Sequence, residues 1–171
     1  MTHYKSWKYL NKTLCDRLCD GLRGRITYFL TRYHTVHNAY GRAAIRLDGK
    51  EIAEFMWINM YIEEGEESKL WEKNAPAEEF RKMHRELAEK GILSEWDFLQ
   101  AAVDFLQMPI ADALSSENYL VKILAIMDRR VGKRTLQKLA EDGEYKSYPE
   151  WVRQFYELRL ILWEKEYVQQ L

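Results

Sequence analysis

Cationic side chains crowd one short segment of the chain, MDRRVGKRTLQKL, which spans residues 127–139 and holds five Lys or Arg. Four of them surround Gly132: Arg129, Arg130, Lys133 and Arg134. The apolar residues of the segment keep helical spacing, so Gly132 either ends a helix or lies in a turn whose basic rim contacts nucleic acid. We favour the helix end, because cations suit the last turn of a helix and the sequence pI of 6.5 is low for a nucleic-acid-binding domain.

The two cysteines, Cys15 and Cys19, are four residues apart in a segment with helical spacing. On one helix their Cβ atoms would be roughly 5 to 6 Å apart, whereas a disulfide needs about 3.8 Å. A zinc site would need two further Cys or His ligands at a familiar spacing, and the neighbouring sequence does not supply them. We therefore expect two reduced, packed thiols, and neither a metal ion nor any other cofactor.

The histidines and the glutamate run do not form a recognisable catalytic pattern. His34 and His37 would point to opposite faces of an extended strand, and we interpret them as surface or turn residues. His84 has no Ser or Cys placed for it to activate, so we expect it to be a packing residue. Four glutamates are predicted to form a solvated acidic face: Glu63, Glu64, Glu66 and Glu67.

The elements that must position these residues begin with a helix and three strands. Apolar residues recur at three- and four-residue steps over residues 4–20, which predicts a helix. Residues 25–36 are rich in β-branched and aromatic side chains and predict a strand. Asp48-Gly49 is typical of a two-residue hairpin turn between strands at 43–47 and 51–57. The three strands would form an antiparallel meander with one face packed against helices.

The rest of the chain is predicted to be helical. Ser94 and Asp97 resemble a capping box at the start of one helix, and a short turn is expected at 110–114. Ser116 would be the N-cap of the next helix, which Gly132 would end. We predict an α+β fold with an N-terminal helix, a three-stranded antiparallel β-meander and a mostly helical C-terminal two-thirds. Its expected organisation is a single domain over 1–171, with helix and meander in 1–58 and the helical part in 59–171.

The composition is that of a folded protein: the chain has 171 residues, of which 47% are hydrophobic and 31% charged. Disorder is therefore not expected. No apolar run reaches the roughly 18 residues of a membrane span, and the first residues lack the apolar core of a signal peptide. We expect a cytoplasmic protein without a membrane partner.

Charge is unevenly distributed along the chain, although the formal net charge is only −1. Residues 1–50 have a balance of +7, residues 51–120 a balance of −10, and residues 121–171 a balance of +2. Such a distribution can steer a charged partner toward one face of a protein. It can equally be self-complementary, with the acidic middle docked on the basic start.

Three segments carry a resemblance to a known family. They are Leu-Cys-x-x-Leu-x-Gly-Arg at 18–25, Asp-Gly-Lys-Glu at 48–51 and Asp-Arg-Arg-Val-Gly-Lys-Arg-Thr-Leu at 128–136. With Phe-Tyr-Glu-Leu-Arg at 155–159, they resemble a family of small, uncharacterised bacterial proteins. The resemblance implies a bacterial, cytoplasmic, single-domain protein and no known activity. It also suggests one charge network, for which the candidates are Arg25, Arg42, Asp128, Arg130, Arg134 and Arg159; Arg129 and Lys133 are further candidate binding residues. We expect Asp128 to pair with an arginine and the remaining cations of residues 128–136 to face solvent or the acidic middle.

Two classes of function fit these observations best. The chain contains none of the strongly specific catalytic motifs, so we expect no enzymatic activity. We favour a non-catalytic accessory or inhibitor protein, of bacterial, phage or mobile-element origin, that binds another protein through its acidic middle and basic ends. The alternative is a nucleic-acid-binding regulator that uses the basic residues at 23–50 and 129–138. A third hypothesis is an enzyme without a recognisable motif, in which arginines would hold a phosphate.

Overall fold

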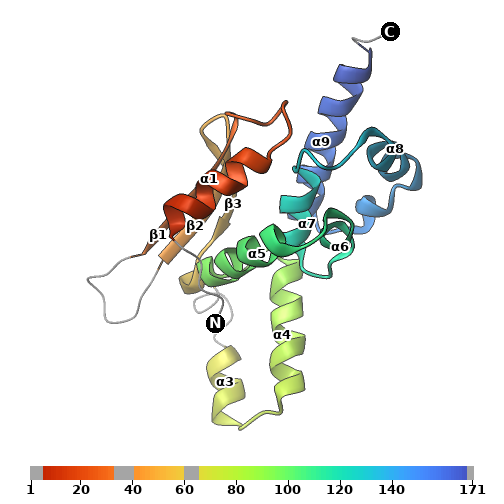
Figure 1. Ribbon diagram of the computed structural model, residues 1–171. Helices are drawn as coiled ribbons and strands as arrows, with labels where there is room; N and C mark the ends of the chain where they lie inside the picture. Colours follow the sequence, from red (N-terminus) through yellow and green to blue (C-terminus); the bar gives the residue numbers. More distant parts are fainter. Residues whose placement is uncertain (1–5, 33–40, 60–65, 169–171) are drawn as a thin grey trace.

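The computed structural model describes residues 6–32, 41–59 and 66–168, and it has the predicted α+β architecture (Figure 1). The N-terminal elements are α1 (Trp7–Arg17), β1 (Ile26–Arg32), β2 (Gly41–Leu47) and β3 (Lys50–Phe55). The helices that follow are α3 (Glu66–Glu72), α4 (Ala77–Glu89), α5 (Glu95–Gln107), α6 (Ile110–Ser115), α7 (Tyr119–Ile126), α8 (Lys133–Asp142), the 3-10 helix η1 (Glu144–Ser147) and α9 (Glu150–Val168).

The three strands form the predicted antiparallel meander in the order β1-β2-β3. The Asp48-Gly49 turn is confirmed: φ is 50° at Asp48 and 81° at Gly49, as a tight hairpin turn of this type requires. A register shift follows Ile45 in the pairing of β2 with β3. The last part of the predicted first strand, with His34 and His37, lies outside the described residues.

One face of the sheet packs against α1 and α5, and the core is built there. Its strand residues are Ile26, Tyr28, Ala43, Ile45 and Phe55, each at most 5% exposed. The ring of Phe98, from α5, stacks on Phe55 with a centroid distance of 5.5 Å. The capping box of Ser94 and Asp97 is confirmed at the start of α5, which fixes where this helix meets the sheet.

α7 is the central helix of the C-terminal part (Figure 1). Every residue from Leu120 to Asp128 is buried, because α5, α6 and α9 all contact α7. A helix that is apolar on all sides can be stable only in such a position. The apolar run LVKILAI therefore explains why the other helices surround this one.

Four predictions about the helices are wrong. α1 ends at Arg17 instead of residue 20, since Leu18 adopts an extended conformation with ψ 142°. Residues 110–115 form the short helix α6 instead of a turn. α7 is capped by the side chain of Asn118, not by Ser116. α7 also ends at Ile126, so Gly132 does not end this helix but is the N-cap of α8.

α3 and α4 form a hairpin that projects from the rest of the molecule (Figure 1). We call these two helices the helical arm. Its base is held where α4 ends, because the indole N–H of Trp151 donates to the carbonyl oxygen of Ala88 at 3.0 Å and the Tyr119 hydroxyl donates to Glu89 at 2.6 Å. Toward α3, the contact within the arm is between the rings of Trp71 and Phe80, 4.8 Å apart.

Candidate functional site

The end of α1 and the connection from α7 to α8 lie side by side (Figure 1). Residues 17–19 run antiparallel to residues 127–129 and are joined to them by backbone contacts. The Cys19 N–H donates to the Met127 carbonyl oxygen at 2.9 Å, and the Arg129 N–H donates to the Arg17 carbonyl oxygen at 2.8 Å. Between these two hydrogen bonds, Leu18 and Asp128 form an isolated β-bridge. We call this junction the seam; it joins two segments more than a hundred residues apart in the sequence.

Asp128 is the buried charge of the seam, and its side chain is 0% exposed. Its carboxylate accepts from the backbone N–H of Arg130 at 2.7 Å, from Arg130 Nη2 at 2.9 Å and from Arg130 Nε at 3.1 Å. Arg17 Nη1 lies 3.9 Å from the same carboxylate. The guanidinium of Arg130 also lies over the buried ring of Phe105. The expectation that Asp128 pairs with an arginine is therefore confirmed.

The remaining predicted cations of this segment lie at the surface. Arg129, Lys133 and Arg134 are exposed, and the side chains of Arg129 and Arg134 make no hydrogen bond or ion pair within the described part of the chain. The seam places Arg17 beside Arg129 and Arg130, which shortly precede α8 in the chain. We call this set the basic corner: Arg17, Arg129, Arg130, Lys133 and Arg134.

Arg25 belongs to a different group, at the hairpin of the sheet. Its guanidinium donates two hydrogen bonds to Asp48, from Nε at 3.0 Å and from Nη2 at 2.7 Å. These hydrogen bonds lower the pKa of Asp48. In addition, the backbone N–H of Asp48 donates to the carbonyl oxygen of Arg25 at 2.8 Å, so this pair holds the β2–β3 turn to the residue that precedes β1.

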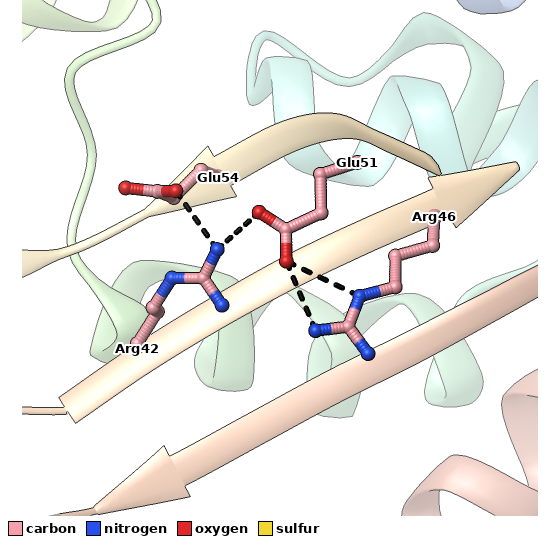
Figure 2. A network of polar contacts seen from close by, with 4 residues as sticks. All are labelled: Arg42, Arg46, Glu51 and Glu54. Atoms are coloured by element: carbon pink, nitrogen blue, oxygen red, sulfur yellow. Dashed lines mark hydrogen bonds and ion pairs between the residues drawn. The ribbon is translucent and has the colours of Figure 1, made fainter. Parts of the chain in front are cut away.

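Arg42 belongs to a third group, on the outer face of the sheet (Figure 2). It donates to both Glu51 and Glu54, while Arg46 donates to Glu51 at 2.9 Å. Hydrogen bonds from Arg46 and Arg42 lower the pKa of Glu51. The guanidinium of Arg46 also lies 4.6 Å from the ring centre of Phe29. Basic residues of β2 and acidic residues of β3 thus neutralise one another across the sheet.

Arg159 is buried within α9, with 6% of its surface exposed. Among the described residues, its Nε and Nη1 atoms have no hydrogen-bond partner. Burial raises the pKa of the Cys19 thiol, and the positive charge of Arg159 partly offsets this rise. The single charge network suggested by the sequence is therefore wrong: ion pairs place Arg25, Arg42 and Asp128 in separate groups, and Arg159 makes no ion pair with any of them within the described residues.

The expectation that the two cysteines share one helix is wrong. Cys15 is half-buried in α1, whereas Cys19 follows the end of α1 and is buried in the seam. Both thiols are free, and burial raises the pKa of each. A raised pKa disfavours the thiolate, which is the reactive form of cysteine, so both side chains act here as small packed groups.

The predicted acidic face falls largely outside what the structure shows. Glu63 and Glu64 lie outside the described residues, and Glu66 and Glu67 begin α3, so this face remains a prediction. Within the described residues, no three His, Cys, Asp or Glu are grouped as a metal site would require. None of the helices described there has the length and apolarity needed to span a membrane.

Two buried ionisable residues were missed by the sequence reasoning. Glu95 is 1% exposed, and its carboxylate accepts from the backbone N–H groups of Gly41 at 3.0 Å and Trp57 at 2.9 Å. Lys122 lies in the otherwise apolar run of α7, and its ammonium donates to Tyr148 and to a backbone carbonyl of α6. A lysine within an apolar run was the available signal; nothing local distinguishes Glu95 from an exposed first-turn glutamate.

Together these features define a small α+β protein with a β-meander, a projecting helical arm and a basic corner where the end of α1 meets the α7–α8 connection. Residues 6–160 match the SF0329 protein family, and the chain belongs to this family. The matched range contains all the segments on which the resemblance in the sequence rests. No curated protein matches the chain, and no solved structure matches it either.

Proposed function

We propose that this chain is a non-catalytic protein that binds another protein through the helical arm. The observation that carries the proposal is Trp71, whose residue surface is 66% exposed on α3. Tryptophan is among the residues that contribute most to protein–protein binding energy, because it buries a large and rigid apolar surface. A small accessory or inhibitor protein of a bacterium, phage or mobile element would act in this way.

The arm has the shape and composition of a contact element. Only Met83 and Leu87 are buried on α4, so most of the surface of this helix is open to solvent. Trp71 rests against Phe80 with the two ring centres 4.8 Å apart, which limits the freedom that the indole would lose on binding. An ordered, exposed aromatic residue costs less conformational entropy to bury than a mobile one.

The buried ionisable groups support a role without catalysis, because each one that has partners joins parts of the fold. Asp128 joins α1 to the α7–α8 connection. Glu95 holds the start of β2 and the segment after β3 to α5. Lys122 joins α7 to α6 and to the segment before α9. Catalytic acids and bases need access to a substrate, and these three side chains are enclosed.

The test is capture of a partner from a lysate of the source cells, with the purified chain as bait and mass spectrometry as the readout. We expect a protein that binds the wild-type chain in stoichiometric amount and is lost with Trp71→Ala. Truncating an interface tryptophan of this kind costs about 2 kcal/mol or more of binding energy, or roughly thirtyfold in affinity.

The matched control is Trp96→Ala, since Trp96 is also exposed, at 46%, but lies on α5 outside the arm. Capture should survive this change, and thermal melts should show both variants folded. Equal capture by wild type and Trp71→Ala would exclude the arm as the contact. Loss of capture with both variants would show that the arm has no special role.

A further inference from the structure

The basic corner retains positive charge after its internal ion pairs are counted. Asp128 is shared between Arg17 and Arg130, and it is the carboxylate buried at their centre. Arg129 and Arg134 are exposed and make no ion pair within the described residues. Two arginines whose charge is not compensated thus lie beside two others that share one carboxylate.

The backbone at the start of α8 adds to the positive electrostatic potential of the basic corner. α8 begins at Gly132, which supplies no side-chain cap to the first turn. The N–H groups of a first helical turn have no partner within the helix, and they form the positive end of the helix dipole. Lys133 and Arg134 are the first two residues of this ten-residue helix, so side-chain and backbone charge point to one class of ligand, an anion.

We propose that the basic corner binds a carboxylate-rich segment of a protein partner. This inference rests on the proposed protein-binding function and names the chemistry of the partner. Arginine suits carboxylates because its planar guanidinium can donate two parallel hydrogen bonds to one carboxylate. Charged pairs at the rim of an interface steer association and fix the orientation of the partner, while Trp71 supplies apolar contact on the arm.

Carboxylates are favoured over nucleic-acid phosphates for two reasons. The chain has a net charge of −1, whereas nucleic-acid-binding domains carry a large positive charge over one face. Within the described residues, the aromatic ring that a cation of the corner covers is that of Phe105, which lies beneath Arg130 and is 1% exposed. It is therefore closed to the base stacking on which single-strand binding depends.

The experiment uses the full chain and a fluorescently labelled oligoglutamate peptide, with binding followed by fluorescence anisotropy at low and at physiological salt. The test variant is the double charge reversal R129E/R134E. We expect it to weaken oligoglutamate binding at low salt by about tenfold or more, since it converts two attractions into two repulsions.

The matched control is K8E/K50E, which changes the net charge equally at two exposed lysines outside the corner. At physiological salt its affinity for oligoglutamate should stay within about twofold of wild type, because exposed charges more than about 8 Å apart are then largely screened. Equal weakening by both double variants would overturn the proposal, since attraction would then depend on overall charge alone. Absence of binding by the wild-type chain would also overturn it.

An oligothymidylate of equal charge separates the two anion classes. Tighter binding of oligothymidylate than of oligoglutamate, lost in R129E/R134E, would overturn the proposal in favour of nucleic acid. Trp71→Ala should bind oligoglutamate as the wild-type chain does. Failure of the corner would therefore leave the arm as the contact, and failure of the arm would leave the corner unaffected.

Discussion

Asp128 shows how one buried carboxylate can organise several cations. Its side chain is fully enclosed, and it is compensated by two arginines that are each about 30% exposed. Burying a carboxylate is costly unless it is paired and hydrogen-bonded. The Arg130 backbone N–H and the Arg130 side chain satisfy it together, so this residue fixes the backbone as well as the charges of the corner.

We expect Asp128→Ala to lower the free energy of unfolding by roughly 3 kcal/mol, the low end of the range for breaking a buried pair, because both arginines can still reach water. Urea denaturation measures the change. Arg134→Ala is the control and should stay within about 0.5 kcal/mol of wild type, since Arg134 is exposed and makes no ion pair within the described residues. An unchanged midpoint for Asp128→Ala would show that the carboxylate does not stabilise the seam.

The contribution of Lys122 to the free energy of unfolding depends on pH, and the direction of this dependence follows from the burial of its side chain. Burial lowers the pKa of its ammonium below the ordinary value of 10.5. In the unfolded chain the pKa returns to that value, so between the two the unfolded state binds more protons. The contribution of Lys122 to stability therefore rises with pH, through the folded-state pKa and up to 10.5.

The unfolding free energy of wild type minus that of Lys122→Met should therefore increase as the pH is raised in this window. Taking a difference is necessary because buried tyrosines have the opposite dependence: burial raises the pKa of Tyr156, for example. Lys138→Met, at an exposed position of α8, should give a flat difference. Chemical denaturation at a series of pH values makes the comparison, and a flat curve for Lys122→Met would contradict it.

Among the elements, the β2–β3 hairpin depends on the conformation of its turn. Gly49 has φ 81°, and a Cβ atom there would meet no other atom within 4 Å. Gly49→Val is therefore expected to be destabilising through backbone strain alone, by about 1 to 3 kcal/mol. Lys50→Val, one residue later and at the first position of β3, should change stability by less than about 0.5 kcal/mol. Thermal unfolding of the two variants tests the difference, and equal midpoints would exclude strain at the turn.

The elements that local chemistry determines could be predicted from the sequence. Asp48-Gly49 gave the hairpin and Ser94 with Asp97 gave the start of α5, because both signals act within four residues. The end of α1 could not be predicted, since Leu18 leaves the helix to pair with Asp128. The role predicted for Gly132 was wrong for the same reason, because the chain leaves the α7 helix before Gly132 and enters the seam.

The candidate site was predicted only in part, because its contacts join distant segments. The basic residues at 129–134 and the pairing of Asp128 were found from the sequence. Arg17 was not, since its place beside Arg129 depends on a hydrogen bond between backbones far apart in the chain. The exposure of Trp71 was not predicted either, because periodicity alone does not tell a packed apolar residue from an exposed one.

At the scale of the whole molecule, the charge asymmetry of the sequence is partly cancelled by the fold. Arginines of β2 meet glutamates of β3 (Figure 2), so part of the basic start neutralises part of the acidic middle, as the self-complementary alternative required. Glu95 is also withdrawn from the surface. The basic corner keeps its charge because its cations outnumber its one buried carboxylate.

The distribution of burial predicts how the molecule opens. α7 is enclosed on all sides, whereas α4 buries only Met83 and Leu87, and regions with few buried apolar contacts open at lower free energy than the core. Hydrogen exchange followed by mass spectrometry should therefore show fast exchange in peptides from the arm. The slowest exchange should occur in α7 and in the seam, where the N–H groups of Cys19 and Arg129 are bonded across distant segments.

Asp128→Ala provides the control, because it should speed exchange in the seam and leave that of the arm unchanged. The arm is held at its base by Trp151 and Tyr119, which lie outside the seam, so it should open independently of Asp128. Exchange of the arm at the same rate as α7 would contradict this picture and would mean that the whole chain unfolds as one unit. In that case the arm would be a stable part of the core, and the exposure of Trp71 would be a property of the rigid fold.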